Sequence, residues 1–525
     1  MLRRFRSVRG LGLVAILAVT VAYATLLQGS GWNQNSHYAL TRALAAGTPS
    51  IDQTRYETGS GVTGDISVYR GHTYSNKAPG FAFATLPAFL ALRAAGDAWP
   101  VPDASGQLWF LGLWSVVLPA FLLLILVRKL SNELEPGFGT AAAVTLGLGT
   151  LMLPFATLFF SHILSALLGF AAFTVLWYER RGPPRLSYLA AAGLLAGYAI
   201  TTEFPNAIMA GILGLAALAR PSRVRRALAY GGGAIVGLAP LLAYDQWAFG
   251  SPFRVPYQYT VGFGSTGSFF LATPSFRRFI EVLFAPAGVF RTTPVIVLAA
   301  VGIVPLFRRG YRYEACVVAA IGLAFFLFEA SYATPFGGGS PGPRQLIPML
   351  PFLALPLAAA FRCMPLTTLS VAAVSVGEMV AATITHPIEY TGHSAGWFDR
   401  LGSHDFVATV LSFFSGGHFL DRLSLRSTAD WYPLLLFFVP VVLAITLAVA
   451  ERRPFSLRRR DGLRAGLCLA GWFILAREGP RLLLGHPTVG SGWAPAVVLS
   501  IAVAVALVAS ALPYLLTSRG DRLPS

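Results

Sequence analysis

Residues 11–27 read LGLVAILAVTVAYATLL, and four arginines stand between positions 3 and 9, directly before them. An apolar run of this length can cross the hydrocarbon core of a membrane. A basic flank and an apolar run are also typical of a secretory signal, but no clear small-x-small cleavage site follows. We therefore predict an uncleaved first membrane-spanning helix over 11–28, entered from the cytoplasm.

The rest of the chain repeats this apolar pattern. Of its 525 residues, 55% are hydrophobic and only 12% are charged, and the mean hydropathy is +0.62. This composition is too apolar for soluble domains of such length, so we predict an all-α polytopic integral membrane protein. We expect about fourteen spans, at 11–28, 106–128, 138–156, 159–178, 187–202, 205–219, 227–246, 293–307, 314–331, 346–362, 367–386, 432–450, 464–477 and 494–516.

Basic residues orient these predicted spans. If the first helix leaves the cytoplasm, twenty-five of the forty lysines and arginines fall in cytoplasmic loops and at the two termini. Cytoplasmic loops of membrane proteins carry such an excess. We therefore predict a protein of the cell membrane with both termini in the cytoplasm. Its long extracytoplasmic loops would lie at about 29–105, 247–292 and 387–431. The net charge of +17 is explained by these short clusters, and we expect no nucleic-acid partner.

The first long loop is predicted to carry two interfacial helices. Gly80 to Ala95 is apolar, but it has only sixteen residues with Pro87 in the middle. Counting it as a span would turn every later basic cluster outward, so we expect it to lie along the outer membrane surface. Ser36 to Ala46 forms a second predicted helix, with Asn35 or Ser36 as its cap and Gly47 to end it.

The first loop also carries charged residues that could perform chemistry. Asp52 and Asp65 are candidate catalytic carboxylates, because an acid whose pKa is raised by partial burial can deprotonate a hydroxyl. Lys77, one of only two lysines, could neutralise a phosphate as it leaves, and His37 could orient a substrate. In the alternative interpretation, the aspartates cap turns and Lys77 extends to the membrane interface.

A second candidate is the run YATPFGGGSPGPRQ at 332–345, which lies at the outer end of one predicted span and just before the next. Glycines let the backbone approach a ligand closely, and the guanidinium of Arg344 suits a phosphate through two parallel hydrogen bonds. The alternative is a Gly/Pro hinge whose arginine pairs with an acid or a lipid headgroup.

Three further ionisable residues, His162, Glu203 and Asp245, lie near the outer ends of predicted spans. Ionisable groups at membrane depth usually face a protein interior or water, so all three could orient a substrate in one cavity. A single histidine, however, is more often a hydrogen-bonded core residue. Because no ligand spacing supports a metal and no nucleotide motif is present, we expect no cofactor; a divalent cation has no support from spacing.

These residues, in this order, resemble the GT-C membrane glycosyltransferases, and among them bacterial aminoarabinose transferases and the family 39-like protein O-mannosyltransferases. The resemblance rests on 32–44, on Asn76-Lys77-Ala78-Pro79 and on the run GPRQLIP at 342–348. It implies a GT-C-like catalytic transmembrane module over 1–362. Residues 363–525 would form a variable C-terminal transmembrane region.

The resemblance further implies transfer of a sugar from a polyprenyl-phosphate-linked donor to a glycan, lipid or protein acceptor at the extracytoplasmic face, with inversion. Lys77 matches the lysine that contacts the donor phosphate, and Asp52 and Asp65 match outward acids. The chain departs from the family at Asn33-Gln34-Asn35, where many relatives have Asp-Glu, and an amide cannot act as a general base. The alternatives are a lipid or solute transporter, or a catalytically degenerate transferase.

Overall fold

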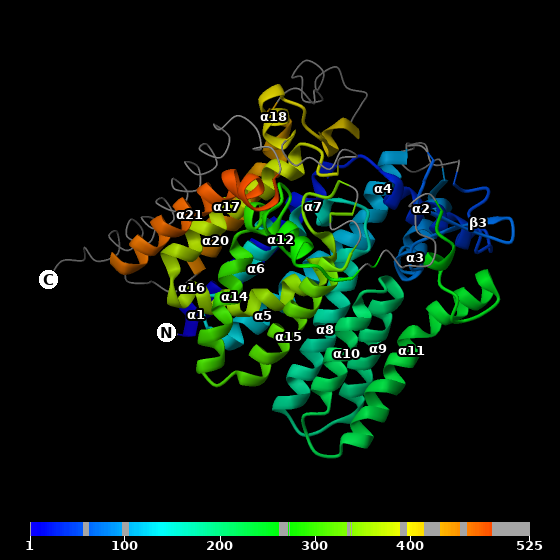
Figure 1. Cartoon of the computed structure of the whole chain (residues 1–525), viewed down its shortest axis with the longest axis horizontal. Helices are drawn as coiled ribbons and strands as arrows, with labels where there is room; N and C mark the ends of the chain where they lie inside the picture. The colour runs from blue at the N-terminus through cyan, green and yellow to red at the C-terminus, as the bar shows by residue number, and fades with distance from the viewer. Residues whose placement is uncertain are drawn as a thin grey trace.

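The computed structural model describes most of the chain. The described residues are 2–55, 62–96, 104–261, 271, 273–332, 336–337, 339–388, 396–413, 431–451 and 459–485. Within these ranges the protein is helical throughout, apart from two small two-stranded sheets. The helices form one bundle, and the chain's first loop lies over one end of it (Figure 1).

The first part of the bundle contains eleven α-helices and one π-helix among the described residues. They are α1 (Leu2–Ala24), α2 (Trp32–Ala45), α3 (Gly80–Ala95), α4 (Ala104–Gly112), the π-helix η2 (Leu113–Val117), α5 (Leu118–Leu134), α6 (Gly139–Leu148), α7 (Met152–Thr157), α8 (His162–Arg181), α9 (Leu186–Thr202), α10 (Asn206–Ala217) and α11 (Arg223–Phe249).

The second part continues with α-helices and short 3-10 helices. They are η3 (Pro256–Tyr259), α12 (Phe276–Phe284), α13 (Val289–Thr292), α14 (Val295–Arg308), α15 (Arg312–Ala330), η4 (Arg344–Met349), α16 (Leu350–Cys363), α17 (Pro365–Ile384), α18 (Gly396–Ser403), η5 (Val410–Phe413), η6 (Tyr432–Leu434), α20 (Leu435–Glu451) and α21 (Arg459–Leu484).

Seven described helices are long and apolar enough to cross a membrane: 106–134, 162–181, 223–249, 312–330, 344–363, 365–384 and 432–451. An eighth is added if α12–α13 and α14, which meet at an 86° bend, are counted as one broken span. Five further apolar helices, including α9 and α10, have only 10–17 residues. The chain is therefore an all-α polytopic membrane protein. The sequence-based count of fourteen remains a prediction, and its last span, 494–516, lies outside the described residues.

The helix that was predicted over Gly80 to Ala95 is α3, with the same bounds, and its position at the membrane interface stays a prediction. The predicted helix from Ser36 is α2, but its predicted cap was wrong, because α2 begins four residues earlier at Trp32. The Gln34 side chain accepts a hydrogen bond from the Gly31 backbone N–H at 3.0 Å and so stabilises this earlier start. Gly47, with φ of +75°, follows the helix as predicted.

The two sheets tie distant segments to the first loop. Strands β2 (Ile66–Tyr69) and β3 (His72–Ser75) form an antiparallel hairpin in which Ile66 pairs with Ser75. Strand β1 (Leu26–Leu27) pairs with β4 (Ala408–Thr409), so the C-terminal region returns to the end of α1.

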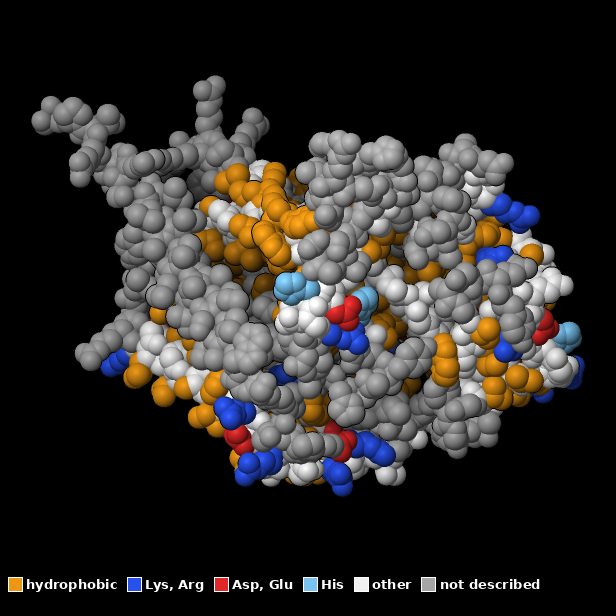
Figure 2. Space-filling model, turned by 90° about the horizontal axis from the view of Figure 1, so that it is seen from above, with side chains coloured by type: hydrophobic (Ala, Val, Ile, Leu, Met, Phe, Trp, Pro, Cys, Tyr) orange, Lys and Arg blue, Asp and Glu red, His pale blue; other side chains and the backbone are white. Residues whose placement is uncertain are grey.

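Seen from above, charged and histidine side chains lie in small groups among hydrophobic ones (Figure 2).

Buried ion pairs hold the helix ends opposite to the first loop. Arg226 at the start of α11 donates two hydrogen bonds of 2.7 Å to Glu179 at the end of α8. Glu135 is fully buried and pairs with Arg362 at 2.9 Å and with Arg309. Because a buried carboxylate needs such partners, these contacts fix the register of the helices that carry the site.

Helices α9 and α11 approach each other through glycines. A Cβ on Gly197 would lie 2.2 Å from the Ala234 carbonyl oxygen, and one on Gly193 would lie 1.9 Å from that of Tyr230. Small residues allow such close backbone contact between membrane helices. We expect Gly197→Leu to destabilise the protein by about 1–3 kcal/mol or more, because the helices must separate.

The measurement for Gly197→Leu is thermal unfolding of the purified protein in detergent. Its matched control is Gly211→Leu on α10, where a Cβ would meet no atom within 4 Å. Equal melting temperatures for the two variants would contradict this account of the helix pair.

Candidate functional site

The β2–β3 hairpin joins Asp65 to Lys77. Asp65 directly precedes β2, and Lys77 follows β3 by two residues, so antiparallel pairing brings them together. Lys77 Nζ lies 2.9 Å from Asp65 Oδ2, and the two side chains are only 12% and 13% exposed. Ser36 Oγ on α2 donates to the Asp65 carbonyl oxygen at 2.7 Å, which anchors this turn to the helix.

Burial changes the acid–base behaviour of Lys77. Desolvation lowers the pKa of its ammonium, and the cation of Arg344 lowers it further, while Asp65 and Glu203 oppose the shift. The net decrease means that the surrounding carboxylates do not fully offset the cost of burying this charge. An additional anion near Lys77 would therefore be stabilised.

Glu203 forms the second charged group of the site. It directly follows α9, and its Oε1 accepts a hydrogen bond from Ser161 Oγ at 2.6 Å. Ser165 Oγ donates to its other oxygen at 3.3 Å. His162, the first residue of α8, places Nδ1 2.5 Å from Glu203 Oε1, and both side chains are nearly buried.

Arg344 begins η4 and lies at the edge of the same site. Its guanidinium carbon is 5.7 Å from the centre of the Phe160 ring. A Cβ on Gly337, whose φ is +54°, would lie 2.6 Å from Arg344 Nε, so glycine is required for this close approach. Among the described residues, no carboxylate pairs with Arg344 at ion-pair distance.

The charged residues of the site influence the pKa values of two nearby tyrosines. Burial raises the pKa of Tyr332 to about 12, with Arg344 opposing the shift and Glu329 and Asp65 adding to it. Burial also raises the pKa of Tyr257 well above its ordinary value, and Glu203 and Asp65 contribute. Asp65, Glu203 and Arg344 act on both tyrosines. Lys77 pairs with Asp65, and His162 with Glu203, so we define these five residues as one charged cluster.

The sequence interpretation missed Glu329, at the end of α15. This side chain is fully buried, and its two carboxylate oxygens have no hydrogen-bond partner among the described residues. The only signal was a single acid in the apolar run LAFFLFEA at 323–330, shortly before the loop that leads to Arg344. Tyr257 was missed as well, because no sequence pattern links it to the first loop, whereas Tyr332 opens the second candidate run.

His37 lies beside the charged cluster. It is 1% exposed, and its ring contacts that of Phe81 edge to face at 4.9 Å. Desolvation lowers the pKa of His37 well below its ordinary value, and Lys77 and His162 add to this. The imidazole is therefore neutral at physiological pH, and neither of its nitrogens has a hydrogen-bond partner among the described residues.

Asp52 and Asp245 lie apart from the cluster. Asp52 Oδ2 is 2.8 Å from His72 Nδ1 on the exposed side of the hairpin. Burial raises the pKa of Asp52, but hydrogen bonds from Ser50, His72 and Thr73 outweigh this and lower it to about 2. Asp245 is fully buried on α11, and its carboxylate oxygens have no hydrogen-bond partner within the described ranges.

The helices and this cluster define the protein as an all-α polytopic membrane protein with buried charges beneath its first loop. In the part of the chain that the structure describes, no three His, Cys, Asp or Glu side chains are grouped so that they could hold a metal ion.

Comparison with known proteins gives only structural similarities. No protein-family model matches the chain, and no curated protein matches it. ArnT from Cupriavidus metallidurans bound to undecaprenyl phosphate is similar over 95% of this chain and 76% of its own, with 15% identity and a TM-score of 0.47. The Archaeoglobus fulgidus oligosaccharyltransferase in its apo form is similar over 91% of this chain and 60% of its own, with 12% identity and a TM-score of 0.41. Both identities are below 25%, so the two comparisons report a similarity of fold alone.

Proposed function

We propose that the protein transfers a sugar from a polyprenyl-phosphate donor to an acceptor at the extracytoplasmic membrane face. The observation that carries this proposal is the charged cluster, in which Lys77 and Arg344 lie near each other beside the Asp65 carboxylate. The cations of Lys77, whose side chain is 12% exposed, and of Arg344, which is half-buried, would stabilise a leaving phosphate. Asp65, 2.9 Å from Lys77, would lie close to the reacting carbon.

The proposed step is a single displacement. The oxygen of an acceptor hydroxyl attacks the anomeric carbon, and the bond from that carbon to the phosphate oxygen breaks. The hydroxyl proton passes to Asp65, and the bonding electron pair leaves with the polyprenyl phosphate, which Lys77 and Arg344 hold. The configuration at the anomeric carbon is inverted. The sugar–phosphate bond supplies the driving force, so the reaction needs no nucleotide.

The ion pair between Asp65 and Lys77 couples donor binding to catalysis. A carboxylate paired with an ammonium is a weak base, because the cation stabilises its charged form. When a donor phosphate binds Lys77, this stabilisation is shared and Asp65 becomes more basic. Donor binding would thus activate the base for the acceptor.

Glu203 and His162 would position the substrate rather than react with it. Glu203 is held by Ser161 and Ser165, and its neighbour His162 lies at the start of α8. A carboxylate fixed by two hydroxyls can accept hydrogen bonds from sugar hydroxyls with little loss of its own freedom. His37, neutral and beside Lys77, could accept or donate one more.

The departure at Asn33-Gln34-Asn35 is compatible with this mechanism. These residues lie in the first turn of α2, where Gln34 accepts the capping hydrogen bond from Gly31. Gln34 therefore serves the helix start, and the role of base falls to Asp65, the carboxylate beside Lys77.

Asp52 is the control for this assignment. We expect Asp52→Asn to retain transfer within about threefold, because its carboxylate contacts His72 and Thr73 rather than the cluster. The measurement is the rate of transfer by the purified variant in liposomes. A loss of activity as large as that of an Asp65 variant would move the base to Asp52.

The test of the proposed function uses liposomes that contain the purified protein and a panel of radiolabelled polyprenyl-phosphate sugars. We expect wild type to release sugar from the lipid fraction of at least one donor when a membrane extract supplies the acceptor, and a heat-inactivated sample to release none. No release from any donor would refute the proposal.

A transporter is the second candidate, and one observation favours it. The broken span between α13 and α14 carries Arg291, which is 6% exposed and interacts with the buried Glu378 of α17. Transporters often place ionisable groups at such breaks. In the same liposomes, movement of labelled lipid or solute across the bilayer without release of sugar would support this candidate.

A further inference from the structure

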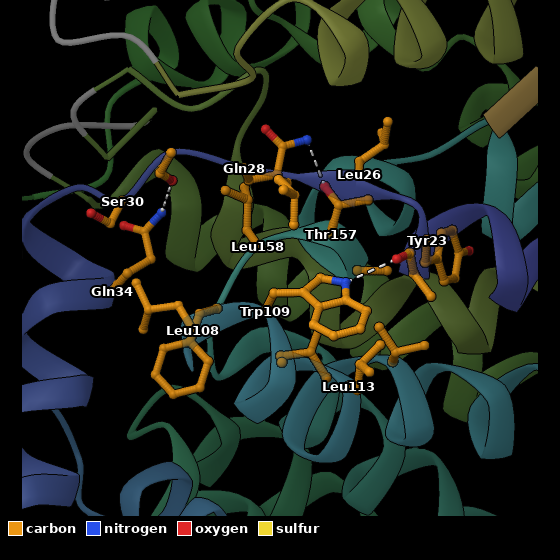
Figure 3. Close-up of a pocket in the computed structure, with 18 residues that line it drawn as sticks. Tyr23, Leu26, Gln28, Ser30, Gln34, Leu108, Trp109, Leu113, Thr157 and Leu158 are labelled. Carbon is orange, nitrogen blue, oxygen red and sulfur yellow. Dashed lines mark hydrogen bonds between the residues drawn. The ribbon is translucent and has the colours of Figure 1, made fainter. Parts of the chain in front are cut away.

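A narrow pocket lies beside the charged cluster, between the end of α1, the start of α2 and the helices α4 and η2 (Figure 3). It encloses about 480 Å³ of space between protein atoms, part of it open to the surroundings. The residues that matter for its chemistry are Gln28, Ser30, Gln34, Trp109, Gly112 and Thr157.

The pocket is lined mostly by apolar side chains, with a few polar ones among them. No Asp, Glu, Lys, Arg or His is among the described residues that line it. Gln28 Nε2 donates to Thr157 Oγ1 at 3.0 Å, which leaves the amide oxygen of Gln28 available. Ser30 Oγ is buried and has no hydrogen-bond partner among the described residues. A buried hydroxyl without a partner is costly, so a ligand that bonds to it would be stabilised.

Trp109 supplies a flat apolar wall. Its Nε1 donates to the Ala24 carbonyl oxygen at 2.9 Å, and this bond fixes the ring inside the pocket (Figure 3). An indole face held in this way can contact the C–H face of a pyranose, while the amides and hydroxyls around it bond to the ring hydroxyls.

The pocket and the charged cluster share one segment of chain. Leu158 and Phe159 line the pocket. The next residue, Phe160, lies beneath Arg344 at 5.7 Å, and Ser161 bonds to Glu203. The chain turns here, with the Phe160 N–H donating to the Leu158 carbonyl oxygen at 2.8 Å, so it spans less than the roughly 10 Å of three extended residues. A ligand in the pocket can therefore reach the cluster.

We propose that this pocket binds an uncharged, hydroxyl-bearing sugar ring during the transfer reaction, and this inference rests on the proposed function. A phosphate or carboxylate in the pocket would lose water without gaining a counter-charge. A prenyl chain would leave the Ser30 hydroxyl without water or a partner. The ring belongs either to the donor sugar or to a sugar of the acceptor.

Gly112→Leu tests the pocket by filling it. A Cβ on Gly112 would meet no atom within 4 Å, and its φ of −63° is suitable for any residue, so the new side chain enters the pocket without backbone strain. Gly211→Leu on α10 is the matched control, since it also has free space. Ser30→Ala removes only the unpartnered hydroxyl and keeps the proposal testable if Gly112→Leu folds poorly.

The kinetic measurement separates the two sources of the sugar. We expect Gly112→Leu to raise either the donor KM or the acceptor KM by at least about tenfold. Ser30→Ala should raise the same KM by a smaller factor. A rise in the donor KM identifies the donor sugar, and a rise in the acceptor KM identifies the acceptor sugar. Unchanged KM values in both variants would overturn the proposal.

The binding measurement does not depend on turnover. Saturation-transfer NMR on protein in lipid nanodiscs, with a panel of methyl glycosides of neutral hexoses and pentoses, should show binding to wild type and to Gly211→Leu. The signal should be lost in Gly112→Leu and absent for glucose 6-phosphate. Binding without sugar release by wild type would refute the proposed transferase while keeping the sugar pocket, and no binding by any glycoside would refute the pocket.

Discussion

Replacement of Asp65 by asparagine is expected to lower the rate of sugar transfer by about 10²- to 10⁴-fold, which is the usual contribution of a general base. Asparagine has nearly the shape of aspartate, but it cannot accept the acceptor's proton. The Lys77 ammonium loses its partner at 2.9 Å and becomes more available to the donor phosphate. We therefore expect kcat to fall while the KM for the donor stays unchanged or decreases.

The measurement compares kcat and donor KM of purified Asp65→Asn with those of wild type and of Asp52→Asn. Thermal unfolding of the three proteins checks that the hairpin is intact. A variant with wild-type kcat would remove Asp65 from the mechanism. A rise in donor KM with unchanged kcat would assign it to donor binding.

The positions of the helices could be predicted from the sequence, because long apolar runs between basic clusters have few alternatives in a membrane. Described helices lie at every predicted span from 11–28 to 464–477. The start of α2 could not be predicted, because it depends on one hydrogen bond between Gln34 and Gly31. A polar sequence such as Asn33-Gln34-Asn35 is equally compatible with a loop.

The ion pair between Asp65 and Lys77 depends on the register of β2 and β3, and this register could not be predicted from the sequence. Asp65 follows Gly64, Asp52 comes shortly after Pro49 and Ser50, and either could have met Lys77. The pairing of Ile66 with Ser75 decides between them, because it places Asp65 beside the end of β3. The same hairpin brings Asp52 to His72 and Thr73 at its exposed side.

From their positions at the outer ends of spans we expected His162 and Glu203 to face one cavity, but direct contacts between distant helices could not be predicted from the sequence. Glu203 meets His162 because α8 begins where α9 ends, and nothing in either helix's own sequence specifies this contact. Glu329 was overlooked for a related reason. It lies fifteen residues before Arg344, and only the fold of the intervening loop brings their charges within range of each other.

Replacement of Lys77 by methionine is expected to lower kcat/KM for the donor by about 10²- to 10³-fold, because the leaving phosphate loses a preorganised cation. The pH profile gives a second readout. Burial lowers the pKa of Lys77, so its ammonium loses its proton at a lower pH than an ordinary lysine. In wild type, kcat/KM should therefore decline as the pH rises through this lowered pKa, and Lys77→Met should lack that decline.

The matched control is Lys129→Met, which changes the only other lysine of the chain. Lys129 lies near the end of α5, with its ammonium 4.8 Å from the centre of the Tyr178 ring, at the opposite end of the bundle from the first loop. The Lys129→Met variant should keep both the wild-type kcat/KM and its decline at alkaline pH. If Lys77→Met and Lys129→Met behave alike, a general effect of charge at the membrane explains the result, and Lys77 has no special role in holding the phosphate. If only Lys77→Met loses both, the cation beside Asp65 is the group that the departing phosphate requires.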